Sequence, residues 1–184
     1  LAAMDAHLLA MRRRLDEGFG AHKPAVAVVR FSSPTVVFFN GPNSMPQHAL
    51  DLLGLQPAPR VPGSAWGITQ TPITTLGQVR EGVVLHIEPF AQGDQLFGTP
   101  LWQAMPFVKA GRFAALPSIW TYGGVFSVER LAETITAALL RLGMRWRAAG
   151  PRAGQGRPAH GPLQPGLKAL AQQSPNGFVL LVED

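Results

Sequence analysis

The sequence predicts an α/β fold in which helices flank a mainly parallel sheet, and three observations lead to this prediction. Short runs rich in valine, isoleucine and phenylalanine recur at residues 24–31, 35–40 and 82–89, as expected of buried strands. Segments with the helical spacing of apolar side chains alternate with these strands, apart from the first two, which a short turn joins. Glycine, proline and asparagine stand between the two kinds of segment, where turns are expected.

The chain opens with a predicted amphipathic helix over residues 1–17. Its apolar side chains recur three or four residues apart, which places them on one helical face. Arginines at residues 12–14 lie near its C-terminal end, where they complement the helix dipole, and Gly18 is expected to end it. The apolar positions are Leu1, Met4, Leu8, Met11 and Leu15.

The first two strands are joined by a Ser-Ser-Pro turn, and a helix signal follows them. Ser44 is a suitable N-cap, because its hydroxyl can accept from the free backbone N–H groups of the first turn. Gly54 is expected to end this helix, since glycine adopts the left-handed conformation of a C-cap readily. Residues 56–63, with three prolines, are a predicted connector, and residues 75–81 a predicted small helix.

The strand at residues 82–89 leads through a glycine-containing loop to another helix start. Thr99 can cap this helix, the proline after it suits the first helical position, and Pro106 is expected to end the turn. We expect a last strand at residues 119–122. A helix capped by Ser127 should then run to about residue 142.

The chain changes in composition from residue 144 onward. Residues 144–184 are rich in arginine, glycine and proline, with little periodicity, so we expect a disordered tail or the product of a frameshift. Residues 1–133 carry ten basic and nine acidic side chains, against six and two in residues 134–184. The net charge of +5 therefore belongs mostly to the tail, and nucleic acid is not an expected partner.

Other compositional features narrow the class of protein. No cysteine is present, which excludes disulfide and thiol chemistry. No apolar run has the length that a membrane-spanning helix requires. The chain begins at Leu1 inside a helical pattern, without an initiator methionine or a signal peptide, which fits either a domain that starts with a helix or a fragment whose upstream half is absent. The resemblance described below implies the fragment.

Large aromatic side chains mark the candidate site. Trp120 and Tyr122 end the predicted last strand just before a Gly-Gly turn, and Trp66 lies in an earlier loop. Open α/β sheets bind ligands at the carboxyl ends of their strands, and these side chains combine apolar area with a polar tip. On the residues alone, a binding surface and a set of core aromatics remain equally open.

Long segments of the chain resemble a known family. The run TPLWQAMPFVKAGRF followed by PSIWTYGG, with VVFFNGPNS and AWGIT upstream, resembles the C-terminal lobe of periplasmic ferric-hydroxamate siderophore-binding proteins. The resemblance covers about residues 1–140. It implies a Rossmann-like lobe of the class III substrate-binding type. Residues 1–18 would end an inter-lobe helix, and residues 19–143 would form the C-terminal ligand-binding lobe.

The resemblance also implies a function without catalysis. A siderophore would be held between two lobes and delivered to an ABC permease and its ATPase. Trp66 and Trp120 would pack against the chelate, the Tyr122 hydroxyl would donate to it, and Ser64 and Asn43 could also reach it. Iron would be bound only as the siderophore complex, with no cofactor and no metal ligand from the protein.

The resemblance further implies a monomer in the periplasm that meets the membrane only through the permease. Family members dock on their permease through acidic residues, for which Asp51, Glu81 and Asp94 are candidates. Ile68, beside Trp66, offers no polar group to a ligand. The sequence does not determine which siderophore is bound.

Three alternative functions stay open: a receptor for another chelate such as haem or cobalamin, a small α/β enzyme, and a nucleic-acid binder that uses the basic tail. Tyr122 keeps the haem alternative open. His86 and Glu88 share one face of a strand, but no third metal ligand follows at a usual spacing, so a structural histidine is favoured. Trp102 is predicted to be a packing residue.

Overall fold

The centre of the fold is a sheet with the strand order β3-β2-β1-β4-β5. The computed structural model describes residues 2–20, 22–59, 64–119 and 124–148. The strands are β1 (Val26–Ser33), β2 (Val36–Asn40), β3 (Ile68–Pro72), β4 (Val83–Ile87) and β5 (Phe113–Leu116). The helices are α1 (Ala2–Phe19), α2 (Met45–Leu53), the 3-10 helix η1 (Ile73–Gln78), α3 (Gly93–Phe97), α4 (Pro100–Ala104), α5 (Pro106–Lys109) and α6 (Val125–Ala148).

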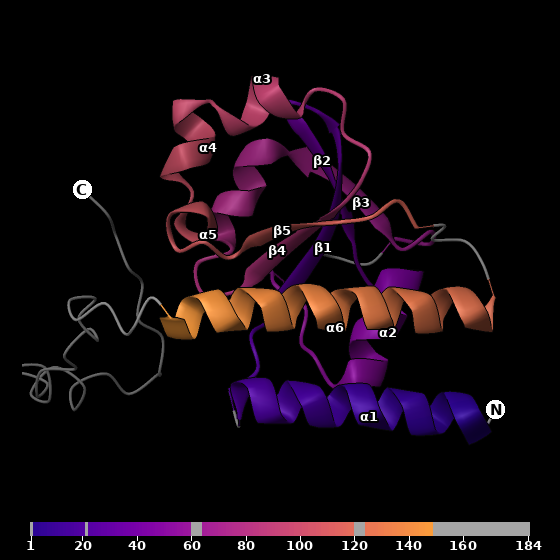
Figure 1. Ribbon diagram of the computed structural model, residues 1–184. Coiled ribbons are helices and arrows are strands. Elements are labelled where there is room, and N and C mark those ends of the chain that lie inside the picture. Colours follow the sequence, from indigo (N-terminus) through magenta and orange to yellow (C-terminus); the bar gives the residue numbers. More distant parts are fainter. Residues whose placement is uncertain (1, 21, 60–63, 120–123, 149–184) are drawn as a thin grey trace, which may run out of the picture. The chain divides into compact units, whose positions relative to one another are not determined.

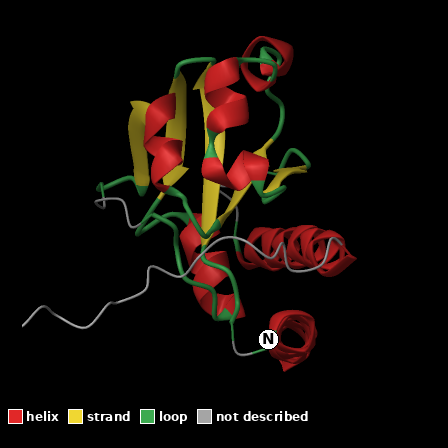
Figure 2. Cartoon of the chain, turned by 90° about the vertical axis from the view of Figure 1, so that its left-hand side faces the viewer, coloured by secondary structure: helices red, strands yellow, loops and turns green. Residues whose placement is uncertain are grey.

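Four of these five strands run in the same direction. β1 pairs in parallel with β4, and β4 pairs in parallel with β5. β2 is antiparallel to both β1 and β3, so only β2 runs the other way. The predicted α/β class with a mainly parallel sheet is confirmed (Figures 1 and 2).

One face of the sheet is covered by the long helices. α1 and α6 run parallel to each other: His7 near the start of α1 contacts Glu129 near the start of α6, and Gly18 near the end of α1 lies against Leu140 further along α6. Figure 1 shows both helices on the same side of the sheet, with α2 crossing them. Their buried side chains join those of β1, β4 and β5 in a largely aliphatic core, called here the aliphatic cluster. It includes Leu8, Met11, Leu15, Leu50, Leu53, Leu85, Ile87, Leu131, Ile135 and Leu139.

The other face is covered by short elements. η1 and the three short helices α3, α4 and α5 supply rings and small apolar side chains that pack against β1, β2 and β4. The rings of Phe31, Phe97, Trp102, Phe107 and Phe113, with the partly buried Phe90 and the ring of His86, form the aromatic cluster. Trp102 is 2 % exposed, which confirms its predicted packing role.

Two predicted helix starts are confirmed by their caps. The Ser44 hydroxyl accepts a hydrogen bond from the Gln47 backbone N–H at 3.1 Å, and Gly54 ends α2 in the left-handed conformation. The Thr99 hydroxyl accepts from the Trp102 backbone N–H at 3.2 Å and starts α4. Pro106 separates α4 from the next turn, but it also begins α5.

Several boundaries differ from the prediction. α1 continues through Gly18 to Phe19, because Gly18 serves as a contact point for Leu140 rather than as a stop. Residues 120–122 of the expected last strand lie outside the described residues, while Ile119 belongs to no strand and packs on the aliphatic cluster. The strand β5, at Phe113–Leu116, was not predicted. Ser127 does not cap α6: this helix already begins at Val125, and the Ser127 N–H donates to the Gly124 carbonyl.

Other elements were missed or extend further than predicted. β3 and α3 were not predicted, and the small helix expected at residues 75–81 is η1 at Ile73–Gln78. α6 continues to Ala148, into the region assigned to the tail. Residues 149–184, on which the rest of the tail prediction falls, lie outside the described residues. Within the described part of the chain, none of the helices has the length and apolar character needed to cross a bilayer.

Candidate functional site

The candidate site is built around the N-terminal end of α2. β2 ends at Asn40, and the turn that follows places Asn43 in the left-handed conformation with φ 70° before the cap residue Ser44. Asparagine tolerates this conformation better than most residues, which explains the turn chemistry of the GPNS segment. The Asn43 side chain is exposed and therefore accessible to a ligand, and its contact with one stays a prediction.

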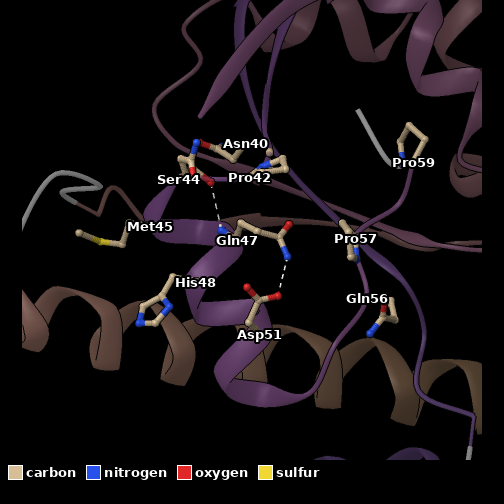
Figure 3. A pocket seen from close by; sticks show the side chains of 12 residues that line it. Asn40, Pro42, Ser44, Met45, Gln47, His48, Asp51, Gln56, Pro57 and Pro59 are labelled. Atoms are coloured by element: carbon tan, nitrogen blue, oxygen red, sulfur yellow. Dashed lines mark hydrogen bonds between the residues drawn. The ribbon is translucent and has the colours of Figure 1, made fainter. Parts of the chain in front are cut away.

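A cavity of about 820 Å³ opens beside this turn, between α2 and the connector that follows it (Figure 3). Within it, the Gln47 side-chain amide donates to Asp51 Oδ1 at 2.7 Å. Both α2 and the connector contribute polar and apolar residues to the cavity wall. It is formed by Asn40, Gly41, Pro42, Asn43, Ser44, Met45, Gln47, His48, Asp51, Gln56, Pro57 and Pro59.

The loop that carries Trp66 is fixed onto the same turn. The Gly41 backbone N–H donates to the Gly67 carbonyl at 2.9 Å. Gly67 has a φ of +69°, and a Cβ there would lie 2.5 Å from the Ser44 backbone nitrogen. Glycine is therefore required at this position for two separate reasons, the backbone conformation and the close contact. This contact holds the loop against the start of α2.

Ser64 closes the loop from the other side. Its hydroxyl donates to the Ile68 carbonyl at 2.8 Å and accepts from the Ile68 backbone N–H at 3.0 Å. The predicted ligand contact of Ser64 remains a prediction, while its contacts here stabilise the loop. Ile68, which has no polar side-chain group, contributes through its backbone.

Trp66 is the most prominent feature of this loop because its side chain is 86 % exposed. An indole left in water forgoes the stabilisation of burial, which for a large aromatic side chain is roughly 1.5–3 kcal/mol. Its neighbours in the loop are anchored by backbone hydrogen bonds, so the ring is presented on a fixed base. The alternative that Trp66 is a core aromatic is wrong.

Trp120 and Tyr122 lie outside the described residues, and so does their predicted grouping with Trp66. The structure brings Asn43, Ser64 and Trp66 into one region through the contacts of Gly67. Residue Ile119, just before the undescribed segment, packs against the aliphatic cluster, and α6 starts just after it.

One exposed aromatic was missed by the sequence analysis. Phe126, in the first turn of α6, is 87 % exposed. The buried stripe of this helix passes through Val128, Leu131 and Ile135, and a residue two positions before Val128 faces away from it. The helical period alone could have shown that Phe126 is not a core residue.

The remaining candidates are three acidic side chains and a histidine. Among the residues that the structure describes, no three histidine, aspartate or glutamate side chains gather where they could hold a metal ion. Asp51, Glu81 and Asp94 are all exposed, so their predicted role in docking stays open. His86 is buried in the aromatic cluster, as a structural histidine would be.

Comparisons with known proteins agree with the resemblance that the sequence indicates. The chain is 38 % identical over 101 residues to the iron(3+)-hydroxamate-binding protein FhuD of Escherichia coli strain K12, covering 54 % of this chain and 34 % of that protein. No protein-family model matches the chain.

Among solved structures, the siderophore-binding protein FhuD of Vibrio cholerae with Fe3+-Desferal bound superposes with a TM-score of 0.73 at 41 % identity, covering 77 % of this chain and 53 % of that one. FhuD2 of Staphylococcus aureus with bound ferrioxamine B has a TM-score of 0.59 at 10 % identity, covering 77 % of this chain and 57 % of that one, which shows the fold alone. The chain thus spans between a third and somewhat more than half of these proteins, and over that part its resemblance to the ferric-hydroxamate-binding proteins is confirmed.

Proposed function

We propose that this chain forms one wall of a binding site for an iron(III)–hydroxamate siderophore and serves as part of the substrate-binding component of an ABC importer. The observation that carries the proposal is the exposed Trp66 ring on a loop fixed to the start of α2. The similarity to a Vibrio cholerae protein that binds Fe3+-Desferal supports this ligand class.

The chemistry of the ligand suits such a wall. The hydroxamate oxygens already saturate the iron, so the protein need not supply metal ligands. A flat apolar surface with a few hydrogen-bond donors is sufficient, and an indole ring offers both apolar area and one N–H donor. We infer that Trp66 and Trp120 pack against the chelate and that the Tyr122 hydroxyl donates to a hydroxamate oxygen. Ser64 and Asn43 would add polar contacts near the same loop.

The partners follow from the same proposal. The chain would deliver the chelate to an ABC permease, whose ATPase powers import, and would act in the periplasm as a monomer. Asp51, Glu81 and Asp94 are the acidic side chains proposed for docking on the permease. Iron enters as part of the substrate, and no separate cofactor is proposed.

The test measures binding of ferrioxamine B by equilibrium dialysis, read by the absorbance of the chelate itself, so that the tryptophans are not the reporters. We expect saturable binding that weakens about tenfold in Trp66→Ala, which corresponds to a loss of about 1.4 kcal/mol. Leu101→Ala is the matched control, because Leu101 is also an exposed apolar residue, 49 % exposed, and lies on α4.

Equal affinity of Trp66→Ala and Leu101→Ala would contradict the role of Trp66. Absence of binding by the unmodified chain at millimolar ferrioxamine B would contradict the proposal for this chain by itself. Haemin and cobalamin, dialysed in parallel, test the alternative chelates: tighter binding of either one would overturn the assignment to hydroxamates.

A further inference from the structure

His86 lies inside the aromatic cluster, on a strand in which every residue is buried. The residue is 4 % exposed. Its ring stacks on Phe113 with 5.2 Å between ring centres and 8° between the planes, and lies 5.3 Å from the Phe31 ring. The ring of Phe97, from α3, is 5.8 Å away on another side. The imidazole therefore contacts the sheet and the short helices together.

The Nδ1 atom of this ring is buried and, among the described residues, has no hydrogen-bond partner. A neutral imidazole can leave one nitrogen as an unpaired acceptor at moderate cost. A protonated ring carries N–H on both nitrogens, and a buried donor without an acceptor costs about 1–3 kcal/mol or more when it is charged. The surroundings therefore suit only the neutral ring.

The nearby charges do not replace a missing acceptor. Burial lowers the pKa of His86 from its ordinary 6.5, and the carboxylate of Glu88 opposes this only in part. Arg30 on β1 alternates with Val29 and Phe31, so it points to the other face of the sheet. The other charged residues on or directly beside the elements that form the aromatic cluster are Arg112, before β5, Asp94 on α3 and Lys109 on α5.

We propose that His86 makes the aromatic cluster an acid-sensitive device: protonation of its ring loosens the packing of α3, α4 and α5 on the sheet while the aliphatic cluster stays packed. The unfolded chain takes up a proton on this side chain below about pH 6.5, whereas the folded protein resists it. The stability that the neutral ring provides is therefore complete above this pH and is lost as the pH falls below it.

The experiment follows the melting temperature of the whole chain between about pH 5 and pH 8. We expect the unmodified chain to lose several degrees below about pH 6.5, and His86→Phe and His86→Leu to lose much less. His22→Gln is the matched control, because His22 is exposed and lies outside the aromatic cluster, and it should keep the acid slope of the unmodified chain. An unchanged slope in both His86 variants would overturn the proposal.

A second measurement tests the proposal even if the His86 variants fail to fold. The C2 proton of His86 in the unmodified chain, followed by NMR during acidification, should titrate below pH 6.5. The near-ultraviolet circular dichroism of the aromatic side chains should decline over the same pH range while the far-ultraviolet helical signal of α1 and α6 persists. Titration of His86 at or above pH 6.5 would refute the proposal, and so would simultaneous loss of both signals.

Discussion

The two faces of the sheet are stabilised in different ways. The aliphatic cluster is covered by α1 and α6, long helices whose buried side chains repeat with the helical period. The aromatic cluster is covered by η1, α3, α4 and α5, none longer than six residues. Helices this short are not stable alone, so their structure depends on the rings they bury.

The comparison shows that the two faces tolerate change differently. Aliphatic side chains in a helical stripe can be exchanged for others of similar volume at modest cost. Rings depend more on relative orientation: Trp102 meets Phe107 edge to face, with 5.5 Å between ring centres and 83° between planes. Such aromatic pairs contribute about 0.5–1.5 kcal/mol beyond the area they bury.

The largest expected effect compares one fully buried residue from each face. Phe107 and Leu131 are both 0 % exposed. We expect Phe107→Ala to lower the free energy of unfolding by about 3–5 kcal/mol and Leu131→Ala by about 2–5 kcal/mol. Removal of the Phe107 ring leaves a larger cavity than removal of the Leu131 side chain, and it also removes the ring contacts with Trp102 and Phe113. Chemical denaturation of both variants measures these losses.

The near-ultraviolet circular dichroism separates the two variants further. Phe107→Ala should reduce the signal of Trp102, which is packed against it, while Leu131→Ala should leave that signal unchanged in the folded protein. If both variants alter this signal equally, the two faces do not behave as separate clusters.

The long periodic elements could be predicted from the sequence, and so could the elements with clear caps. The stripe of Leu8, Met11 and Leu15 is buried as expected, and the caps of Ser44 and Thr99 form the predicted hydrogen bonds. These features are local, because their signals lie within a few residues of each other. Local signals suffice where the helix itself determines which side chains face the core.

The missed elements depend on distant partners. β3 reads ITQTP, polar and ending in proline, and it becomes a strand only because β2 pairs with it at the edge of the sheet. β5 contains two alanines, which have low strand propensity, and pairing with β4 determines its position. The prediction that Gly18 ends α1 was wrong for the same reason: Gly18 contacts Leu140 on another helix, and this contact cannot be inferred from neighbouring residues.

The candidate site divides in the same way. The turn at Asn43 and the cap at Ser44 were predictable from residue type, and the aromatic character of Trp66 was evident. The sequence did not show that Gly67 fixes this loop on the start of α2, since that contact joins residues more than twenty positions apart. The ligand roles of the site residues remain predictions for binding measurements.

A smaller effect is expected from the helix caps, one on each face. Ser44→Ala removes the acceptor of the Gln47 N–H, and Thr99→Ala removes that of the Trp102 N–H. Each should cost about 1 kcal/mol, measured by chemical denaturation. The Thr99 variant should lose more, because its hydroxyl also donates to the Leu96 carbonyl at 2.7 Å and so connects α3 to α4. Equal losses would mean that this second hydrogen bond contributes little.

The smallest effect concerns a contact between the long helices that is an ion pair when His7 is protonated. His7 on α1 places Nδ1 2.8 Å from Glu129 Oε1 and Nε2 3.2 Å from Glu133 Oε1, both on α6. The His7 side chain is 42 % exposed and that of Glu133 46 %, so water screens much of the attraction. We expect His7→Ala to lower the free energy of unfolding by about 0.5 kcal/mol or less at low salt.

The control is a double-mutant cycle on the shorter contact, in which His7→Ala, Glu129→Ala and the double variant are compared to obtain the coupling energy between the two side chains. The coupling should shrink in high salt, since exposed ion pairs are screened over about 10 Å at 0.1 M ionic strength. A coupling above 1 kcal/mol that is insensitive to salt would contradict this expectation. It would mean that the pair contributes to the free energy of unfolding as much as the close contacts at Gly18 and Gly143 do. The aliphatic cluster would then not be the sole interaction that holds α1 on α6.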